Sequence, residues 1–367
     1  MDLPINDNLK ISNLAQLFNN MSESYKLFWF RAIVRKILEG KREMFYDELI
    51  DSMTADAWYM VSEYRLNLGP SDTLESLVDT AYRKSGLKSN EKRETILEFM
   101  RLADDREIRE KKMTLIKNVP YRLQAPFLGR SGGYPWNSIP KMIEIINREE
   151  NLIYSFFDGQ GLERGIIVAK QWAEYITKNA AIVQGWIELN LIEYLQKRNP
   201  SVPGIPNKLR PPEARQLTRV KKYWDAVAEI SPIHDIYTGE ILDKREISVD
   251  HFVPWSYVAH DELWNLGPTT RNVNSSKSND LPEWGEYINR LCGFEYEVFH
   301  ITEQNDQLMH MFKICEKVHI NSNDVRIKLY RSGISAGEFS ENLKTLMMPV
   351  YDSARNMGFG SWKAGGR

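Results

Sequence analysis

Apolar residues recur every three to four positions through residues 1–117, and this spacing predicts a helical N-terminal domain. The densest stretch is Tyr25–Leu38, with Ser24 as its expected N-cap and Gly40 just past its end. Asp72 and Glu75 form a capping-box pattern before the next apolar stretch, so another helix is expected there. No motif in the region demands more than a packed helical scaffold.

Turn-forming residues and short apolar runs alternate through residues 118–225, which predicts a middle region of loops and one long helix. Residues 130–140 (RSGGYPWNSIP) are expected to form a loop, and residues 152–157 a short strand. The glycines of the FDGQGLERG segment lack the Gly-Lys-Ser/Thr of a phosphate loop, so a turn is expected there. A helical stretch over residues 166–195, interrupted at Gly185, follows the turn.

A proline-rich segment and a basic run end the middle region. Residues 199–212 hold five prolines and predict a stiff, extended linker. Between residues 201 and 224 a single acid, Glu213, stands against six basic residues: Lys208, Arg210, Arg215, Arg219, Lys221 and Lys222. Such a run is often a solvated helix face, but its place just before the most polar motif of the chain makes it a candidate nucleic-acid contact.

Residues 226–285 predict a different kind of unit, with two strands and a helix. The segment DIYTGEIL, with Thr238–Gly239 at its turn, suits a β-hairpin. Residues 246–252 (EISVDHF) alternate as the second strand, which Pro254 ends. A loop and a polar helix over residues 269–280 follow. Residues 286–367 return to helical spacing, with a capping box at Ser335 and Glu338 and a kink expected at Pro349. The predicted fold class is mainly α with an embedded α+β unit.

Five polar residues of the α+β unit suit the hydrolysis of a phosphodiester bond. Asp250 at the strand end and Asn274 on the facing helix supply the oxygen ligands that a hard divalent cation prefers. His251 points to the other side of the strand and is suited to take a proton from water near pH 7. Asn265 could hold the imidazole or the loop in place. Lys277, on the same helical face as Asn274, could contact a phosphate.

The order and spacing of these residues resemble the HNH, or ββα-metal, nuclease motif. That motif has Asp-His at a strand end, then Asn before Leu, then His or Asn on a helix with Lys three residues later. The steps of 14 and 9 residues from His251 to Asn265 to Asn274 are similar to those of the HNH domain in RNA-guided CRISPR effector nucleases. The resemblance implies one Mg²⁺ or Mn²⁺ held by Asp250 and Asn274, His251 as general base, and Asn265 as a positioning residue.

One departure from the family concerns zinc. Many HNH proteins carry two Cys-x-x-Cys pairs that bind a structural zinc, and the matching places here hold Asp235, Thr238, Thr270 and Val273. We therefore expect a zinc-less variant with no structural zinc. Since the unit is too small to bury much core alone, packing against flanking helices should replace the metal. The side chains expected to provide this packing are Ile236, Tyr237, Ile241, Phe252, Trp255, Trp264 and Leu266.

Composition limits the remaining choices. The net charge of −2 argues against a generally basic surface, so contact with DNA must come from a local patch. No stretch is apolar enough to span a membrane, and no secretory signal is visible. The two cysteines, Cys292 and Cys315, lie in apolar helical contexts and suggest no disulfide framework. Together these features predict a cytoplasmic protein.

The sequence as a whole predicts a metal-dependent DNA endonuclease with helical N- and C-terminal domains around a ββα-metal nuclease domain. The helical domains are expected to choose the substrate, a protein partner or regulator, or the moment of cutting. Nucleases of this class often act in prokaryotic defence or mobile-element systems, and this fold-level analogy points to anti-phage defence. Two alternatives stay open: an RNA-cutting toxin with the same site, and a catalytically silent binding subunit of a larger complex.

Overall fold

The computed structural model describes residues 2–19, 21–128, 133–211 and 217–365, which belong to two units. The first unit comprises residues 1–200 and 208–211, and the second comprises residues 201–207 and 212–367. Helices account for 58% of the described residues and strands for 7%, so the predicted class, mainly α with an embedded α+β unit, is confirmed. Within the described ranges, none of the helices combines the length and the apolar character needed to cross a membrane.

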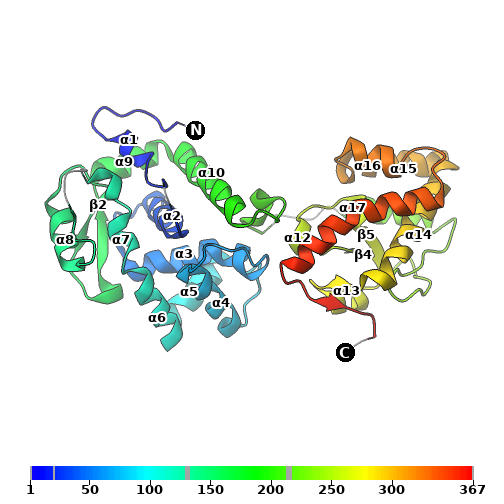
Figure 1. Cartoon of the computed structure of the whole chain (residues 1–367), viewed down its shortest axis with the longest axis horizontal. Helices are drawn as coiled ribbons and strands as arrows, with labels where there is room; N and C mark the ends of the chain where they lie inside the picture. The colour runs from blue at the N-terminus through cyan, green and yellow to red at the C-terminus, as the bar shows by residue number, and fades with distance from the viewer. Residues whose placement is uncertain (1, 20, 129–132, 212–216, 366–367) are drawn as a thin grey trace. The chain divides into compact units, whose positions relative to one another are not determined.

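The first unit is a helical array that includes one three-stranded sheet (Figure 1). Its α-helices are α1 (Ile11–Leu14), α2 (Tyr25–Leu38), α3 (Tyr46–Ser62), α4 (Thr73–Ser85), α5 (Arg93–Leu102), α6 (Arg106–Leu115), α7 (Val119–Arg122), α8 (Ile139–Arg148), α9 (Lys170–Lys178) and α10 (Ala180–Arg198). Single turns of 3-10 helix, η1 (Ala125–Phe127) and η2 (Gly161–Glu163), lie among them. The strands are β1 (Glu43–Phe45), β2 (Tyr154–Phe157) and β3 (Gly165–Val168), with β3 in the centre and antiparallel to both others.

Two helix starts differ in detail from the capping patterns in the sequence. α2 begins at Tyr25 as predicted, but Ser24 does not cap it, because its hydroxyl and backbone N–H donate to the Asp72 carboxylate at 2.7 and 2.8 Å. Asp72 does cap α4, since it also accepts from two backbone N–H groups of the first turn. The Glu75 carboxylate accepts from the backbone N–H of Leu68. One buried carboxylate thus joins the starts of two helices.

The sheet explains why the prediction for the middle region is partly wrong. The helix was expected to begin at residue 166, but residues 165–168 form β3 and the first helix, α9, begins at Lys170. β3 pairs with strands on both sides, and its β-branched residues suit that position. The remaining helix breaks at Asn179, between α9 and α10, and not at Gly185. Because β1 pairs with β3, residues 1–117 and 118–200 lie in one unit, where the sequence suggested two regions.

The boundary between the two units falls within the proline-rich segment. Residues 201–207 belong to the second unit and residues 208–211 to the first. The segment is not extended throughout as predicted, since it forms a turn of 3-10 helix, η3 (Ile205–Lys208). The basic run that begins in this segment is therefore divided between the units.

The second unit surrounds a small two-stranded sheet with helices, of which α14 and α17 lie side by side (Figure 1). Its helices are α11 (Thr218–Val227), α12 (Trp255–Val258), η4 (Leu263–Asn265), α13 (Arg271–Lys277), α14 (Trp284–Glu303), α15 (Asp306–His319), α16 (Asn323–Leu329) and α17 (Ala336–Asn356). Strands β4 (Ser248–His251) and β5 (Leu266–Thr269) are antiparallel, and the short strands β6 (Leu281–Pro282) and β7 (Ser361–Trp362) are parallel. The cap predicted at Ser335 is confirmed, since its hydroxyl accepts from the backbone N–H of Glu338 at 3.3 Å.

One continuous cluster of buried apolar side chains extends from Val220 on α11 to Ala354 on α17. Of the apolar residues expected to replace a structural metal, Ile241 alone is exposed and the rest are buried. Residues 226–285 and 286–367 therefore share one core, where the sequence suggested a separate nuclease domain and a C-terminal region. The physical reason is size, because a small ββα unit cannot bury enough apolar surface by itself.

Candidate active site

β4 ends in the two residues on which the predicted chemistry depends, Asp250 and His251. Its antiparallel partner is β5, with Asp250 opposite Gly267. A Cβ on Gly267 would lie 2.3 Å from the Cδ1 atom of Ile236, so a larger residue at this register would require the Ile236 side chain to move. The turn predicted in residues 235–242 is present, closed by an isolated antiparallel bridge between His234 and Ile241. This segment does not pair with β4, as the sequence suggested, because β5 takes that place.

The carboxylate of Asp250 is buried and held by two side chains from different parts of the unit. The Tyr237 hydroxyl donates to its Oδ2 atom at 2.6 Å, and the Lys277 ammonium lies 3.1 Å from the same oxygen. Burial, together with the nearby Asp250 and Asp235, raises the pKa of the Tyr237 hydroxyl well above its usual value, so this group remains a proton donor. Asp250 is 5% exposed, so its charge depends on the Lys277 ammonium for balance, and the Tyr237 hydroxyl adds a hydrogen bond.

Lys277 differs from the expectation that it contacts a phosphate from the helix surface. Its side chain is fully buried, and its ammonium also donates to the backbone carbonyl of His251 at 2.8 Å. α13 turns this face toward β4, and Asn274, one turn earlier, faces the same strand. In the structure, the Lys277 ammonium therefore pairs with the Asp250 carboxylate and binds the backbone at the end of β4.

The two asparagines hold different parts of the site. Asn265 is fully buried, and its amide accepts from the Val253 N–H at 2.8 Å and donates to the Val253 carbonyl at 2.9 Å. It therefore holds the loop that follows His251. Asn274 is partly exposed and donates its Nδ2 hydrogens to the Ser248 hydroxyl at 3.1 Å and to the Val249 carbonyl at 3.3 Å. These donations orient its amide plane beside β4.

His251 is 4% exposed and is the last residue of β4. Its Nε2 atom lies 2.8 Å from the Oδ1 atom of Asp261, which stands in the loop between α12 and η4. Asp261 was not among the candidates from the sequence. A carboxylate ten residues after the histidine is common in any polar loop, and only the folded loop brings it to the ring.

A polar cavity of about 530 Å³ brings the candidate residues together. Asp250, His251 and Asn274 line it. Arg271, an exposed cation on the first turn of α13, lines it as well and was not predicted. Its signal in the sequence was its position three residues before Asn274, which places both on one helical face. A carboxylate, an amide, an imidazole and a guanidinium therefore line the same cavity.

These residues fit a hard divalent cation with few protein ligands. In the described residues no group of three or more His, Cys, Asp or Glu side chains is placed to hold a metal, so the protein donors would be Asp250 and Asn274. A carboxylate has about four lone-pair positions, so the donors from Tyr237 and Lys277 leave room for a cation. Mg²⁺ is commonly bound by one or two carboxylates and otherwise keeps its waters, and an open, polar cavity suits that mode.

Residues 235–283 match the HNH endonuclease family. This segment belongs to the HNH nuclease family. The match covers the turn at Asp235, strands β4 and β5, α13 and β6, and it ends just before α14. It includes the residues that line the cavity. No curated protein and no solved structure gives a significant match to the chain.

In this HNH domain, the place of the first zinc-binding cysteine holds the buried residue Asp235. Its Oδ1 atom accepts from the backbone N–H groups of Tyr237 at 2.8 Å and Thr238 at 3.2 Å. Its Oδ2 atom accepts from the Thr269 hydroxyl at 2.8 Å and the Thr270 N–H at 3.2 Å. One carboxylate thus joins the turn before β4 to the start of α13, the two segments that a zinc would join in cysteine-bearing relatives.

The six basic residues predicted to contact nucleic acid are divided between the two units. Lys208 is buried in the first unit, with its ammonium 5.2 Å from the centre of the Tyr64 ring, and burial lowers its pKa to about 7. A phosphate contact by Lys208 is therefore wrong for this structure. Arg210, in the same unit, pairs with Glu188 at 2.7 Å. Arg215 lies outside the described residues.

The rest of the basic run lies on α11 in the second unit. Arg219 and Lys222 are exposed, and Lys221 is partly buried. The helix faces the core with Val220, Tyr223, Trp224 and Val227, which leaves its basic residues toward the outside. Arg219, Lys221 and Lys222 therefore remain candidates for contact with a nucleic acid.

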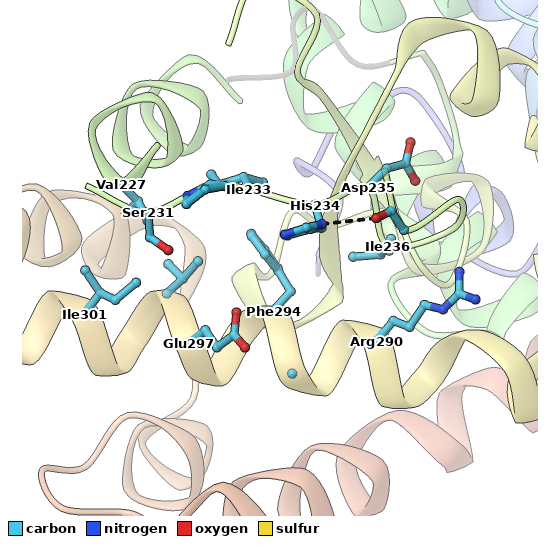
Figure 2. Close-up of a pocket in the computed structure, with 14 residues that line it drawn as sticks. Val227, Ser231, Ile233, His234, Asp235, Ile236, Arg290, Phe294, Glu297 and Ile301 are labelled. Atoms are coloured by element: carbon cyan, nitrogen blue, oxygen red, sulfur yellow. Dashed lines mark hydrogen bonds between the residues drawn. The ribbon is translucent and has the colours of Figure 1, made fainter. Parts of the chain in front are cut away.

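A second cavity, of about 370 Å³, lies between residues 231–239 and α14 (Figure 2). Its polar side chains help to fix the turn before β4. His234 Nδ1 is hydrogen-bonded to the Gly239 carbonyl at 3.1 Å, as drawn in Figure 2. Arg290 donates to the Tyr237 carbonyl. Since Tyr237 in turn donates to Asp250, α14 supports the metal-binding candidate through this turn.

Proposed function

We propose that this protein is a metal-dependent HNH endonuclease that hydrolyses phosphodiester bonds of DNA. The observation that carries the proposal is the polar cavity that Asp250, His251 and Asn274 line together, within the segment that matches the HNH family. A carboxylate, an amide and an imidazole around one space are the groups that cation-assisted hydrolysis of a phosphodiester requires.

Each residue of the cavity has a role in this proposal. Asp250 and Asn274 would hold one Mg²⁺ or Mn²⁺, which when bound neutralises charge on the scissile phosphate. His251 takes the proton of the attacking water. Arg271 binds a phosphate oxygen, since a guanidinium suits bidentate contact with phosphate. Lys277 and Tyr237 keep Asp250 in place, and Asn265 holds the backbone after His251.

DNA is the preferred substrate because the spacing of the site residues resembles that of HNH domains in RNA-guided CRISPR effector nucleases. Arg219, Lys221 and Lys222 on α11 supply exposed positive charge in the same unit, which would attract a phosphate backbone. The first unit and the C-terminal helices would provide contacts to a partner or regulator. By analogy of fold, we place the protein in a cytoplasmic defence system of prokaryotes.

The direct experiment is a cleavage assay on plasmid DNA, single-stranded DNA and RNA with Mg²⁺ or Mn²⁺. His251→Ala should lower the cleavage rate by about 10²–10⁴ and leave DNA affinity nearly unchanged, because it removes the general base. His310→Ala, an exposed histidine on α15, is the matched control and should cleave like the wild type. Undiminished cleavage by His251→Ala would refute the assignment. Cleavage of RNA alone would favour the toxin, and absence of cleavage the binding subunit.

The metal ligands are tested by calorimetric titration of Mn²⁺ into the protein. Asp250→Ala and Asn274→Ala should both weaken binding, and Asp250→Ala more so, because the carboxylate carries the formal charge. Asn265→Ala is the comparison, since its amide is buried against the backbone of Val253. If Asn265→Ala weakened Mn²⁺ binding more than Asn274→Ala, the roles of the two asparagines would be reversed.

A further inference from the structure

The imidazole of His251 is tied to a carboxylate that lies outside the five residues of the HNH pattern. The Nε2 atom of His251 is 2.8 Å from Oδ1 of Asp261, and the two side chains are 5% and 20% exposed. An ionised carboxylate can only accept hydrogen bonds, so this contact requires the proton of a neutral imidazole to be on Nε2. The lone pair needed for a general base is then on Nδ1.

The position of Asp261 is set by residues at the end of α15. His319, the last residue of α15, is buried and donates from Nδ1 to the backbone carbonyl of Asp261 at 2.8 Å. The next side chain in the loop, Glu262, is also buried, and its carboxylate accepts from Nδ2 of Asn321 at 2.6 Å and from Nε1 of Trp264 at 3.1 Å. Two consecutive residues of the loop are therefore anchored to the C-terminal helices.

The backbone of the loop between α12 and η4 also contributes to the position of Asp261. Ala259, which ends α12, has a left-handed conformation with φ of 55°, and this sharp change of direction leads into Asp261. A left-handed conformation is unfavourable for a residue with a Cβ, and it persists where surrounding contacts determine it. The anchors to His319 and Asn321 are such contacts.

We propose that Asp261 is a positioning residue for His251. His319 at the end of α15 and Asn321, just after that helix, hold it in place. The inference rests on the proposed function and extends it, because Asp261 would fix both the ring orientation and the tautomer of the general base. In the reaction, a proton passes from water to Nδ1 of His251. The hydroxide then forms a bond to phosphorus as the bond to the leaving oxygen breaks. α15 lies beyond residues 235–283, so the working site would extend past the HNH segment.

The geometry separates this role from simple stabilisation of the loop. The backbone carbonyl of Asp261 already anchors the loop to His319 of α15, and the side chain of Glu262 anchors it to Asn321, just after that helix. The Asp261 carboxylate, in contrast, is directed at the imidazole. Replacing that carboxylate with an amide of the same shape should therefore leave the fold intact. It would also present either an oxygen or an NH₂ group to Nε2, so the tautomer of His251 would no longer be fixed.

The test uses the full-length protein with Asp261→Asn and, as a matched control, Asp306→Asn. Asp306 is an exposed residue in the first turn of α15. The tautomer of His251 is measured in the metal-free protein by long-range ¹H–¹⁵N correlation spectra, with His251→Ala to assign its signals. Cleavage is measured as kcat and KM on plasmid DNA with Mn²⁺. Thermal unfolding shows that each variant is folded.

We expect the wild type and Asp306→Asn to carry the proton on Nε2, and Asp261→Asn to lose this preference. Its kcat should fall about 10–100-fold with KM nearly unchanged, the usual cost of losing a partner that orients a functional histidine. A proton on Nδ1 in the wild type, or an unchanged kcat in Asp261→Asn, would overturn the role of Asp261 alone. A wild type that cleaves no nucleic acid would overturn the proposed function, and with it the role, while the spectra would still report on the hydrogen bond.

Discussion

Lys277 provides a test of the charge balance in the cavity, because its ammonium is a buried cation beside the Asp250 carboxylate. Replacing it with methionine keeps an unbranched side chain but removes the charge and the donors. Three contacts of Nζ are lost: 3.1 Å to Asp250 Oδ2, 3.4 Å to Asp250 Oδ1 and 2.8 Å to the carbonyl of His251. Of the contacts described for its carboxylate, Asp250 keeps the 2.6 Å hydrogen bond from Tyr237.

The size of the effect follows from burial. Lys277 is fully buried and Asp250 is 5% exposed, so water cannot replace the lost cation. Removing one partner of a buried ion pair costs about 3–5 kcal/mol, and part of this is regained because the methionine carries no charge to desolvate. We therefore expect Lys277→Met to lower the free energy of unfolding by about 2–4 kcal/mol. For a domain the size of the second unit, this corresponds to a fall in Tm of about 4–16 °C.

The assay is calorimetric unfolding of the full-length protein in metal-free buffer and with Mn²⁺. A divalent cation on Asp250 would supply the missing positive charge, so Mn²⁺ should raise the Tm of Lys277→Met more than that of the wild type. Lys313→Met, an exposed lysine on α15, is the control and should change stability by less than about 0.5 kcal/mol. A metal-free Tm for Lys277→Met as high as that of Lys313→Met would refute the reasoning.

Two further predictions concern the turn before β4 and the basic helix. Asp235→Ala should lower the free energy of unfolding by about 2–4 kcal/mol in urea titrations, because four donors lose their acceptor, whereas Asp243→Ala in an exposed turn should have little effect. Elemental analysis should find no stoichiometric zinc, and one zinc per chain would contradict this use of Asp235. Arg219→Ala with Lys222→Ala should weaken binding to DNA of any sequence and reduce the slope of log K against log salt by about 2, since each phosphate contact contributes about 0.9. The same slope in this variant and in Lys313→Ala with Lys317→Ala would make α11 an ordinary solvated face.

The candidate site could be located from the sequence because its main residues are close in the chain. Asp250, His251 and Asn274 lie on a strand and on the helix that follows it, and both elements were predicted with boundaries close to those of β4 and α13. Local periodicity and a Pro at position 254 decide where such elements begin and end. The order of side-chain types then indicated the chemistry.

Residues that depend on distant partners were missed or misplaced. The role of Asp261 requires His319, 58 residues later, and that of Glu262 requires Asn321, 59 residues later. The burial of Lys277 could not be predicted, because a helical pattern of Asn and Ser has no apolar face that reveals which side is buried. The strand partner of β4 was also misassigned. Residues 235–242 and 266–269 are both short segments suited to pairing, so the local pattern could not show which of them pairs with β4.

By itself, the sequence determined the mainly helical class, the helices α2 and α4, and the polar cluster around Asp250 and His251, because periodicity, capping and spacing act over a few residues. Only the tertiary structure decided that residues 226–285 share a core with the C-terminal helices, that Asp235 joins the turn to α13, and that Asp261 reaches His251. These outcomes depend on which buried carboxylates find donors and which apolar faces meet. Both are settled by packing between segments far apart in the chain, where local propensity has no influence.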